Sequence, residues 1–151
     1  MVLPRGLLLL GATVAVLAVL TGSAGASNAT LRATLDTWSN RIGADARAVA
    51  LAAQQRHPRR MTTSANRFHH DSLLAHAATA AQKPSTANGN RARRLALTAF
   101  NDYARAGNNW AASGRARLAR RTAASIADAK TGANYAKAGN KLLVTAGALL
   151  R

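Results

Sequence analysis

The 151-residue chain contains no cysteine and no glutamate, and only 4% of its residues are aromatic. Without cysteine it has neither disulfides nor a lipid-modified amino-terminal cysteine, so an exported form would not be a lipoprotein and would depend on packing alone. Alanine is the commonest residue, and a chain rich in alanine and poor in aromatic residues favours helices over a β-sandwich. The sequence therefore predicts an all-α protein.

Acidic side chains are also scarce, because five aspartates face 21 lysines and arginines, which gives a net charge of +16. A positive field of this size attracts nucleic acid, anionic lipid or acidic polymers. A bias toward alanine and arginine in the composition would produce the same charge without any such partner. Both explanations stay open at the level of composition.

The first 26 residues have the layout of a secretory signal peptide. Arg5 precedes an apolar run from Leu7 to Leu20, and the small residues Ala24 and Ala26 suit the positions before a cleavage site. Cleavage there would leave residues 27–151 as one domain of the size expected for a single core. The alternative is an uncleaved membrane anchor formed by residues 6–26, which are numerous enough to span a bilayer. In either case we expect the domain to lie outside the cytoplasm.

Residues 27–55 show the clearest helical pattern. Apolar side chains follow one another in steps of three and four, interrupted at Asp45, as in a heptad repeat: Leu31, Leu35, Trp38, Ile42, Val49 and Ala52. Asn28 or Thr30 is the expected amino-terminal cap. Pro58 predicts that the helix ends near Arg56 or His57.

The rest of the chain predicts further helices around one loop. A helix over residues 65–82, capped from residues 62–64, is followed by loop chemistry at residues 83–90. From Arg91 a long helix is expected, with Gly107 and Gly114 as a packing seam, then a break near Thr131–Gly132 and a last helix to Leu150. Residues 103–108 recur in similar form at 135–140, which predicts two similar helices. The expected architecture is an antiparallel bundle of about four helices.

No residue set predicts an enzyme. Three histidines and one aspartate are the only candidates for metal binding or hydrolysis, and they match no zinc spacing: His69, His70, His76 and Asp128. A nucleophile elbow and a phosphate-binding glycine loop are missing from the sequence. We therefore expect no catalytic residue, no metal and no cofactor.

The other aspartates and the aromatic residues have structural interpretations. Asp36, Asp45 and Asp71 each follow an arginine by four residues, which predicts helix-surface ion pairs with Arg32, Arg41 and Arg67. Five aromatic side chains lie at apolar-face spacing and are expected in the core instead of stacking on bases or sugars: Trp38, Phe100, Tyr103, Trp110 and Tyr135.

The strongest functional indication is a set of arginines that forms two dense clusters on one predicted helix: Arg91, Arg93, Arg94, Arg115, Arg117, Arg120 and Arg121. Such clusters bind polyanions, and the leader favours anionic surface polymers or lipid headgroups over nucleic acid. The sequence thus predicts an exported, non-enzymatic helical protein that associates with the cell envelope. The alternative is a helical module that self-associates or docks a protein partner through its small-residue seams, with the charge incidental.

Overall fold

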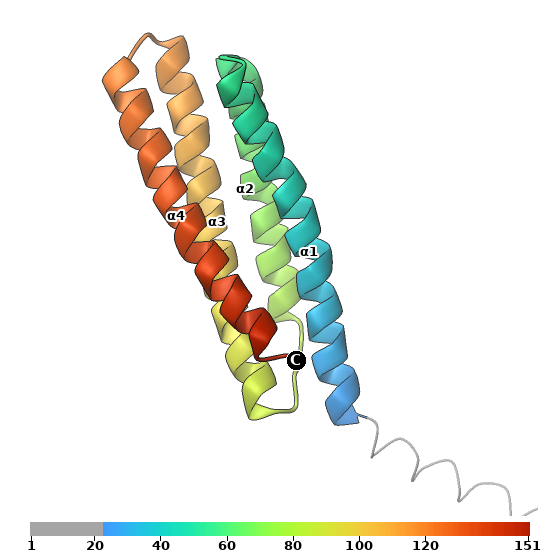
Figure 1. Cartoon of the computed structure of the whole chain (residues 1–151). Coiled ribbons are helices and arrows are strands. Elements are labelled where there is room, and N and C mark those ends of the chain that lie inside the picture. The colour runs from blue at the N-terminus through green and yellow to red at the C-terminus, as the bar shows by residue number, and fades with distance from the viewer. Residues whose placement is uncertain (1–22) are drawn as a thin grey trace, which may run out of the picture.

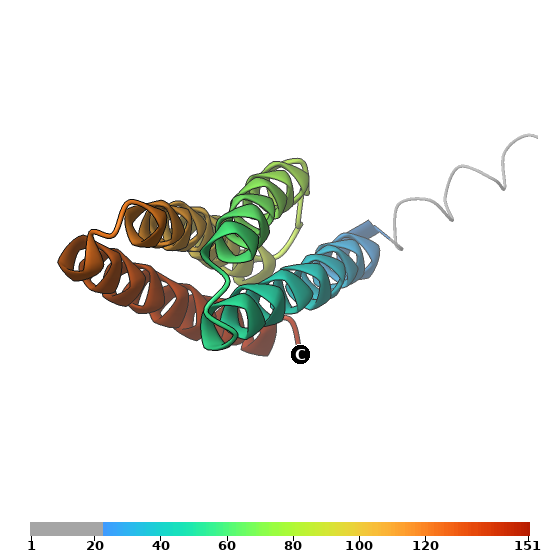
Figure 2. The same cartoon turned by 90° about the horizontal axis from the view of Figure 1, so that it is seen from above.

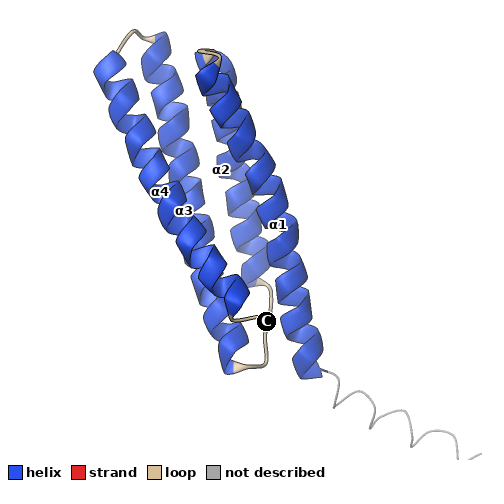
Figure 3. Ribbon diagram, viewed as in Figure 1, coloured by secondary structure: helices blue, strands red, loops and turns tan. Residues whose placement is uncertain are grey.

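The computed structural model describes residues 23–151, with side chains described from Ser27 onward, so the apolar run of the predicted leader lies outside the described part. Four helices make up the fold: α1 (Ser23–Gln54), α2 (Pro58–Ala80), α3 (Ala87–Leu118) and α4 (Thr122–Ala148). No strand occurs among the described residues (Figure 3). The prediction of an all-α protein with about four helices is confirmed.

Successive helices run in opposite directions and pack against each other (Figure 1). The α2/α3 and α3/α4 pairs are in contact along much of their length, whereas α1 packs mainly on α2 and has few backbone approaches to α3. Viewed from above, the helices lie around a shared interior (Figure 2). The two terminal helices therefore each pack mainly on one neighbour, α1 on α2 and α4 on α3.

The core is built from the predicted apolar stripe of α1. Leu31, Leu35 and Ile42 are buried against Phe68 and Phe100, together with alanines from all the neighbouring helices. Burial of this apolar area is the main source of stability in a chain without disulfides.

Glycines let the helices approach closely, as the sequence predicts for Gly107 and Gly114. A Cβ atom added at Gly107 would lie 2.8 Å from the backbone nitrogen of His69, and one at Gly114 would lie 2.9 Å from the carbonyl oxygen of Pro58. Both contacts join α3 to α2, so these positions have no room for a side chain.

The predicted break at Thr131–Gly132 is wrong. The chain leaves α3 after Leu118 and enters α4 at Thr122, and Gly132 lies inside α4. Gly132 serves close packing, because a Cβ there would lie 2.6 Å from the ring of Trp110. The glycine that signals a break in the sequence is thus a contact point between α4 and α3.

Three helix starts also differ from the prediction. α3 begins at Ala87 instead of Arg91, so the end of the predicted loop at residues 83–90 is helical. The hydroxyl of Thr86 caps the helix by accepting from the backbone N–H of Gly89.

α2 begins at Pro58, since proline is compatible with the first turn of a helix, and Thr62 lies within the helix and donates to the Pro58 carbonyl. α1 extends upstream of residue 27, and the amide nitrogen of Asn28 donates to the hydroxyl of Thr86 (2.8 Å) in place of the expected capping role. This contact ties the start of α1 to the connection between α2 and α3.

Candidate functional site

The two predicted arginine clusters lie at opposite ends of α3. Arg93 and Arg115 are separated by 22 helical residues, which corresponds to about 33 Å at the rise of an α-helix. Arg120 and Arg121 follow the end of α3 and belong to its connection with α4, so the prediction that one helix holds all seven residues is wrong for these two. The seven arginines therefore do not form one surface.

In the first cluster, Arg93 has a structural partner. Its guanidinium donates to the carbonyl oxygens of Thr79 (3.2 Å) and Ala80, at the carboxyl end of α2. A cation at this position satisfies carbonyls that have no partner within the helix. Arg91 and Arg94 are the members of this cluster that remain open to a ligand, because neither has a hydrogen-bond or ion-pair partner for its side chain among residues 27–151.

The second cluster lies at the same end of the bundle as Arg56 of the α1–α2 connection and as Arg59 and Arg60 of the first turn of α2 (Figure 1). A hollow of 560 Å³ at this end is lined by residues from the start of α2 and the end of α3: His57, Pro58, Arg59, Arg60 and Leu118. We call this surface the arginine end and define it by seven exposed residues: Arg56, Arg59, Arg60, Arg115, Arg117, Arg120 and Arg121.

Sequence reasoning missed three members of the arginine end: Arg56, Arg59 and Arg60. They are more than 50 residues away from Arg115 in the chain, and only the antiparallel fold brings them together. Their position in the sequence could have identified them. They flank Pro58, where the sequence predicts the end of a helix, and in an antiparallel four-helix bundle the first and third connections lie at the same end.

The two connections at the arginine end have the same backbone geometry. Arg56 and Arg120 adopt positive φ angles of 54° and 57°. In each turn the next residue donates its backbone N–H five residues back, from His57 to Ala52 (2.9 Å) and from Arg121 to Ala116 (2.8 Å). This is the Schellman ending of a helix, which usually has glycine at the left-handed position.

No carboxylate lies within the arginine end itself. Residues 46–70 and 103–127 contain no aspartate, and the first turns of α2 and α4, which both begin here, contain no acidic residue. The amino ends of these helices add their own partial positive charge. The arginine end is therefore a concentrated positive surface that presents guanidinium groups able to bind phosphate or carboxylate in pairs of hydrogen bonds.

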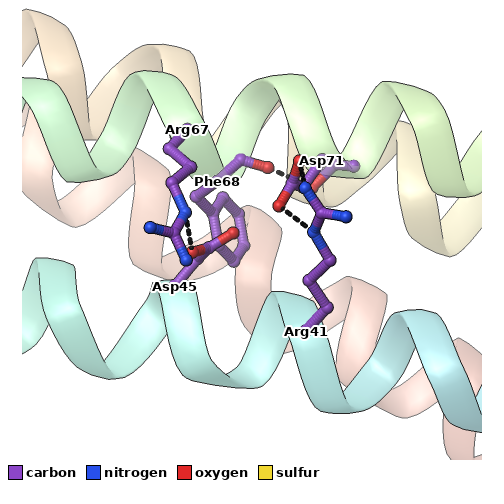
Figure 4. Close-up of polar contacts among 6 residues, drawn as sticks. Arg41, Asp45, Arg67, Phe68 and Asp71 are labelled. Atoms are coloured by element: carbon purple, nitrogen blue, oxygen red, sulfur yellow. Dashed lines mark hydrogen bonds and ion pairs between the residues drawn. The ribbon is translucent and has the colours of Figure 1, made fainter.

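A second polar constellation lies between α1 and α2, where two aspartates are buried (Figure 4). Arg41 of α1 donates to both oxygens of Asp71 on α2 (2.6 and 3.0 Å). Arg67 of α2 forms an ion pair with Asp45 of α1 (2.7 Å). The predicted pairs within each helix are wrong for Arg41 and Arg67, because each arginine binds the aspartate of the other helix.

The predicted pair of Arg32 with Asp36 does form within α1, at 4.0 Å and on the surface. The contrast has a simple cause. Asp36 points to solvent, whereas Asp45 and Asp71 are only 2% and 1% exposed and require partners that reach across the helix interface.

The two buried carboxyl groups have opposite pKa shifts. Burial and a hydrogen bond to Asp71 raise the pKa of Asp45. Burial would also raise the pKa of Asp71, but the hydrogen bonds from Arg41 and from Asp45 outweigh it and lower that pKa. Oδ2 of Asp45 is buried and has no hydrogen-bond partner among the described residues. The two carboxyl groups thus connect α1 to α2 through their crossed ion pairs with Arg41 and Arg67.

The histidines and Asp128 are not brought together. Nδ1 of His69 lies 2.8 Å from the carbonyl oxygen of Ala104, and His70 and His76 are on the same helix as His69, while Asp128 is on α4. Residues 23–151 contain no group of three side chains that could hold a metal ion.

The aromatic residues divide into two groups. Phe100 and Tyr103 are buried, as the sequence predicts for the core, whereas Trp38, Trp110 and Tyr135 are half-buried. Arg41 lies over the ring of Trp38, with 5.3 Å between its guanidinium carbon and the ring centroid, and Arg105 lies over Tyr135 at 5.6 Å. These cation–π contacts engage arginines away from the arginine end.

In the described part of the chain, no helix has both the length and the apolar character needed to cross a membrane. Comparisons with protein-family models, with curated proteins and with solved structures found no match to this chain. The arguments for function therefore rest on the residues and geometry of the bundle.

Proposed function

We propose that this is an exported, non-enzymatic helical protein that binds anionic polymers of the cell envelope through its arginine end. The observation that supports the proposal is the convergence of two sequence-distant arginine groups on one end of the bundle without an intervening carboxylate. Several exposed guanidinium groups in one place bind repeated phosphate or carboxylate groups more strongly than scattered ones do.

The orientation of α1 favours polymers over lipid headgroups in an anchored form. The 32 residues of α1 correspond to about 48 Å, and the arginine end lies at the carboxyl end of this helix (Figure 1). If the leader stays in the membrane, the arginine end points away from that membrane. It then faces the polymers outside the membrane instead of the headgroups beside the anchor.

A cleaved form keeps the contacts that position α1. The hydroxyl of Ser27 lies 3.0 Å from that of Ser85 and accepts a hydrogen bond from the Ser85 backbone (3.2 Å). Asn28 reaches Thr86 in the same connection. A chain that begins at Ser27 therefore retains the polar contacts between α1 and the α2–α3 connection. We keep secretion as the proposal, and anchoring by residues 6–26 is the alternative.

The alternative function, docking or self-association through small-residue seams, loses the surfaces named for it. Gly107 and Gly114 face α2 within the same chain, and Gly132 faces α3. A protein partner would have to use other surfaces. The sign of this alternative in solution would be a defined oligomer whose formation does not respond to polyanions.

The test is a salt-dependent titration with polyphosphate and with polygalacturonate, run beside vesicles that contain phosphatidylglycerol. The variant Arg59→Gln/Arg60→Gln/Arg121→Gln removes three charges from the arginine end. The matched control Arg47→Gln/Arg91→Gln/Arg94→Gln removes three charges elsewhere on the bundle. We expect the first variant to weaken polymer binding about tenfold or more at low salt and the control to change it little.

Equal losses in both variants would mean that only net charge matters and would contradict the proposal, as would wild-type binding that does not weaken with salt. Vesicle binding stronger than polymer binding would shift the partner to lipid. Location is tested by the intact mass of the protein in medium and membrane fractions washed at low and high salt. A mass that begins at Ser27 and is released by salt supports a secreted, charge-held protein, whereas a salt-resistant full-length mass supports the anchor.

A further inference from the structure

A hollow of 180 Å³ that is partly open to solvent is lined by residues of all four helices, away from the arginine end; we call it the cavity. One wall consists of three aromatic rings in contact, in which the centroid of Phe68 is 5.2 Å from that of Trp110 and 5.9 Å from that of Tyr103. Ile42 and Leu143 contribute aliphatic surface, and no charged side chain lines the cavity. The cavity is thus an apolar space with an aromatic wall.

The space exists because small residues meet where α1 and α4 face each other. Gly43 and Ala46 of α1 and Ala136 of α4 all line it. A Cβ added at Gly43 would have no neighbour closer than the Arg47 guanidinium, at 3.8 Å. The atoms around an unfilled space forgo dispersion contacts that a bound molecule would restore.

One polar group remains available at the wall. The hydroxyl of Tyr103 donates to Oδ1 of Asn140 (2.6 Å), and burial raises the pKa of Tyr103 to about 12, so this hydroxyl stays protonated. The hydrogen bond fixes the orientation of the Asn140 amide. Its NH₂ group has no hydrogen-bond partner among residues 27–151 and can donate to a ligand.

We propose that this cavity binds one uncharged, single-ring aromatic molecule that has a hydrogen-bond acceptor, with the ring against Phe68 and Trp110 and the acceptor at Asn140. The size supports one ring, since an apolar space of about 150 Å³ is sufficient for benzene. Rings prefer edge-to-face or offset contacts with other rings, which the aromatic wall provides. A charged ligand is excluded because no lining side chain would compensate its lost hydration.

This inference is independent of polyanion binding, and it is tested with two fluorinated probes by ¹⁹F NMR titration of the protein. We expect saturable line broadening of 4-fluoroacetophenone, and binding of fluorobenzene that is several-fold weaker because fluorobenzene lacks the carbonyl acceptor. Asn140→Leu should abolish this difference while retaining fluorobenzene binding.

Gly43→Leu and, from the opposite wall, Ala136→Leu fill the cavity and should weaken both probes about tenfold or more, because the volume available for the ring is lost. Gly147→Leu is the matched control, because a Cβ there has no neighbour within 4 Å and the position does not line the cavity. The proposal is overturned if neither probe binds saturably, or if a correctly folded filling variant binds as wild type does.

Discussion

At the scale of single residues, Asp45 occupies a position where the spacing of α1 favours an apolar side chain. Ile42, Asp45 and Val49 continue the alternation of three and four residues that places a side chain in the interface with α2. A carboxyl group there must be paired, since an isolated buried charge is very unfavourable. Arg67 provides the pair, and the consequence of burial is a carboxyl that holds its proton more tightly.

The pH dependence of stability should therefore differ between wild type and Asp45→Asn. The raised pKa of Asp45 means that its contribution to the free energy of unfolding is largest below the unfolded value of 3.8 and is lost as pH rises through the folded pKa. The asparagine amide of the variant can still donate to Asp71 but cannot ionise, so the variant should lack this loss. Urea unfolding from about pH 4 to pH 7 tests it, and parallel curves for the two proteins would show that folding does not raise the pKa of Asp45.

Asp71 should behave in the opposite way. Its pKa is lowered, so its contribution is present above pH 3.8 and is lost as pH falls through the folded pKa. Asp71→Asn removes the paired hydrogen bonds of Arg41 and should lower the free energy of unfolding at pH 7 by about 2 kcal/mol. Urea midpoints at pH 7 measure this, with the exposed Asp36→Asn as the control that should change little.

Arg56 and Arg120 should show opposite effects on stability and on binding. Each occupies a left-handed backbone position that glycine adopts without steric cost, so Arg56→Gly and Arg120→Gly should each stabilise the fold by about 1 kcal/mol. Both should weaken polyphosphate binding. Arg115→Gly, in the last turn of α3, is the matched control and should destabilise by about 1 kcal/mol, because glycine is unfavourable in a helix. Destabilisation by all three in urea unfolding would contradict the assigned strain.

At the scale of helices, the glycine contacts determine how closely α3 approaches α2. Gly107→Ala places a methyl group against the backbone of His69 and Ala65 and should lower the free energy of unfolding by about 1 to 3 kcal/mol. Gly147→Ala meets no neighbouring atom and should raise it by up to about 1 kcal/mol. Thermal unfolding of the two variants compares them directly, and equal shifts would show that helix propensity alone determines the result.

The helices were predictable to the extent that local chemistry determines them. The apolar stripe of α1 defines its helix without help from the rest of the chain, whereas only the first part of the predicted loop at residues 83–90 is a loop, because Asn88, Gly89 and Asn90 lie in the first turn of α3. Gly132 misled the prediction because a glycine in a helix indicates either a break or a close contact, and only the position of Trp110 decides between them. The connection between α3 and α4, residues 119–121, contains neither proline nor glycine, so the sequence has no local signal for the end of α3.

The candidate site was predictable only in part for a similar reason. The arginine clusters are visible in the sequence, but their grouping depends on which helix ends meet. Arg93 is predicted to contact a polyanion, and the structure adds that its guanidinium donates to carbonyl oxygens at the end of α2, which the sequence does not reveal. The exchanged ion pairs of Asp45 and Asp71 depend on the register between α1 and α2, which spacing within one helix does not reveal.

At the scale of the whole molecule, α1 should open before α3. It packs mainly on α2, whereas α3 is in contact with helices on both sides. Hydrogen exchange measured by mass spectrometry should show α1 amides exchanging at a lower opening free energy than those of α3. Asp71→Asn should accelerate exchange in α1 more than in α4, and uniform acceleration would mean that the bundle opens as one unit.

The turn at Arg56 recurs at Arg120, one turn on each helical hairpin at the same end of the bundle, so under the proposed function the molecule has two similar contact points for a polymer. A short anion can occupy only one of them, whereas a polymer long enough to reach both binds the second within the same complex, at a high effective concentration. Affinity should then rise in a step with polymer length, and the length at which the step occurs would report the separation of the two hairpins. The bundle would in this sense measure the chain length of its ligand.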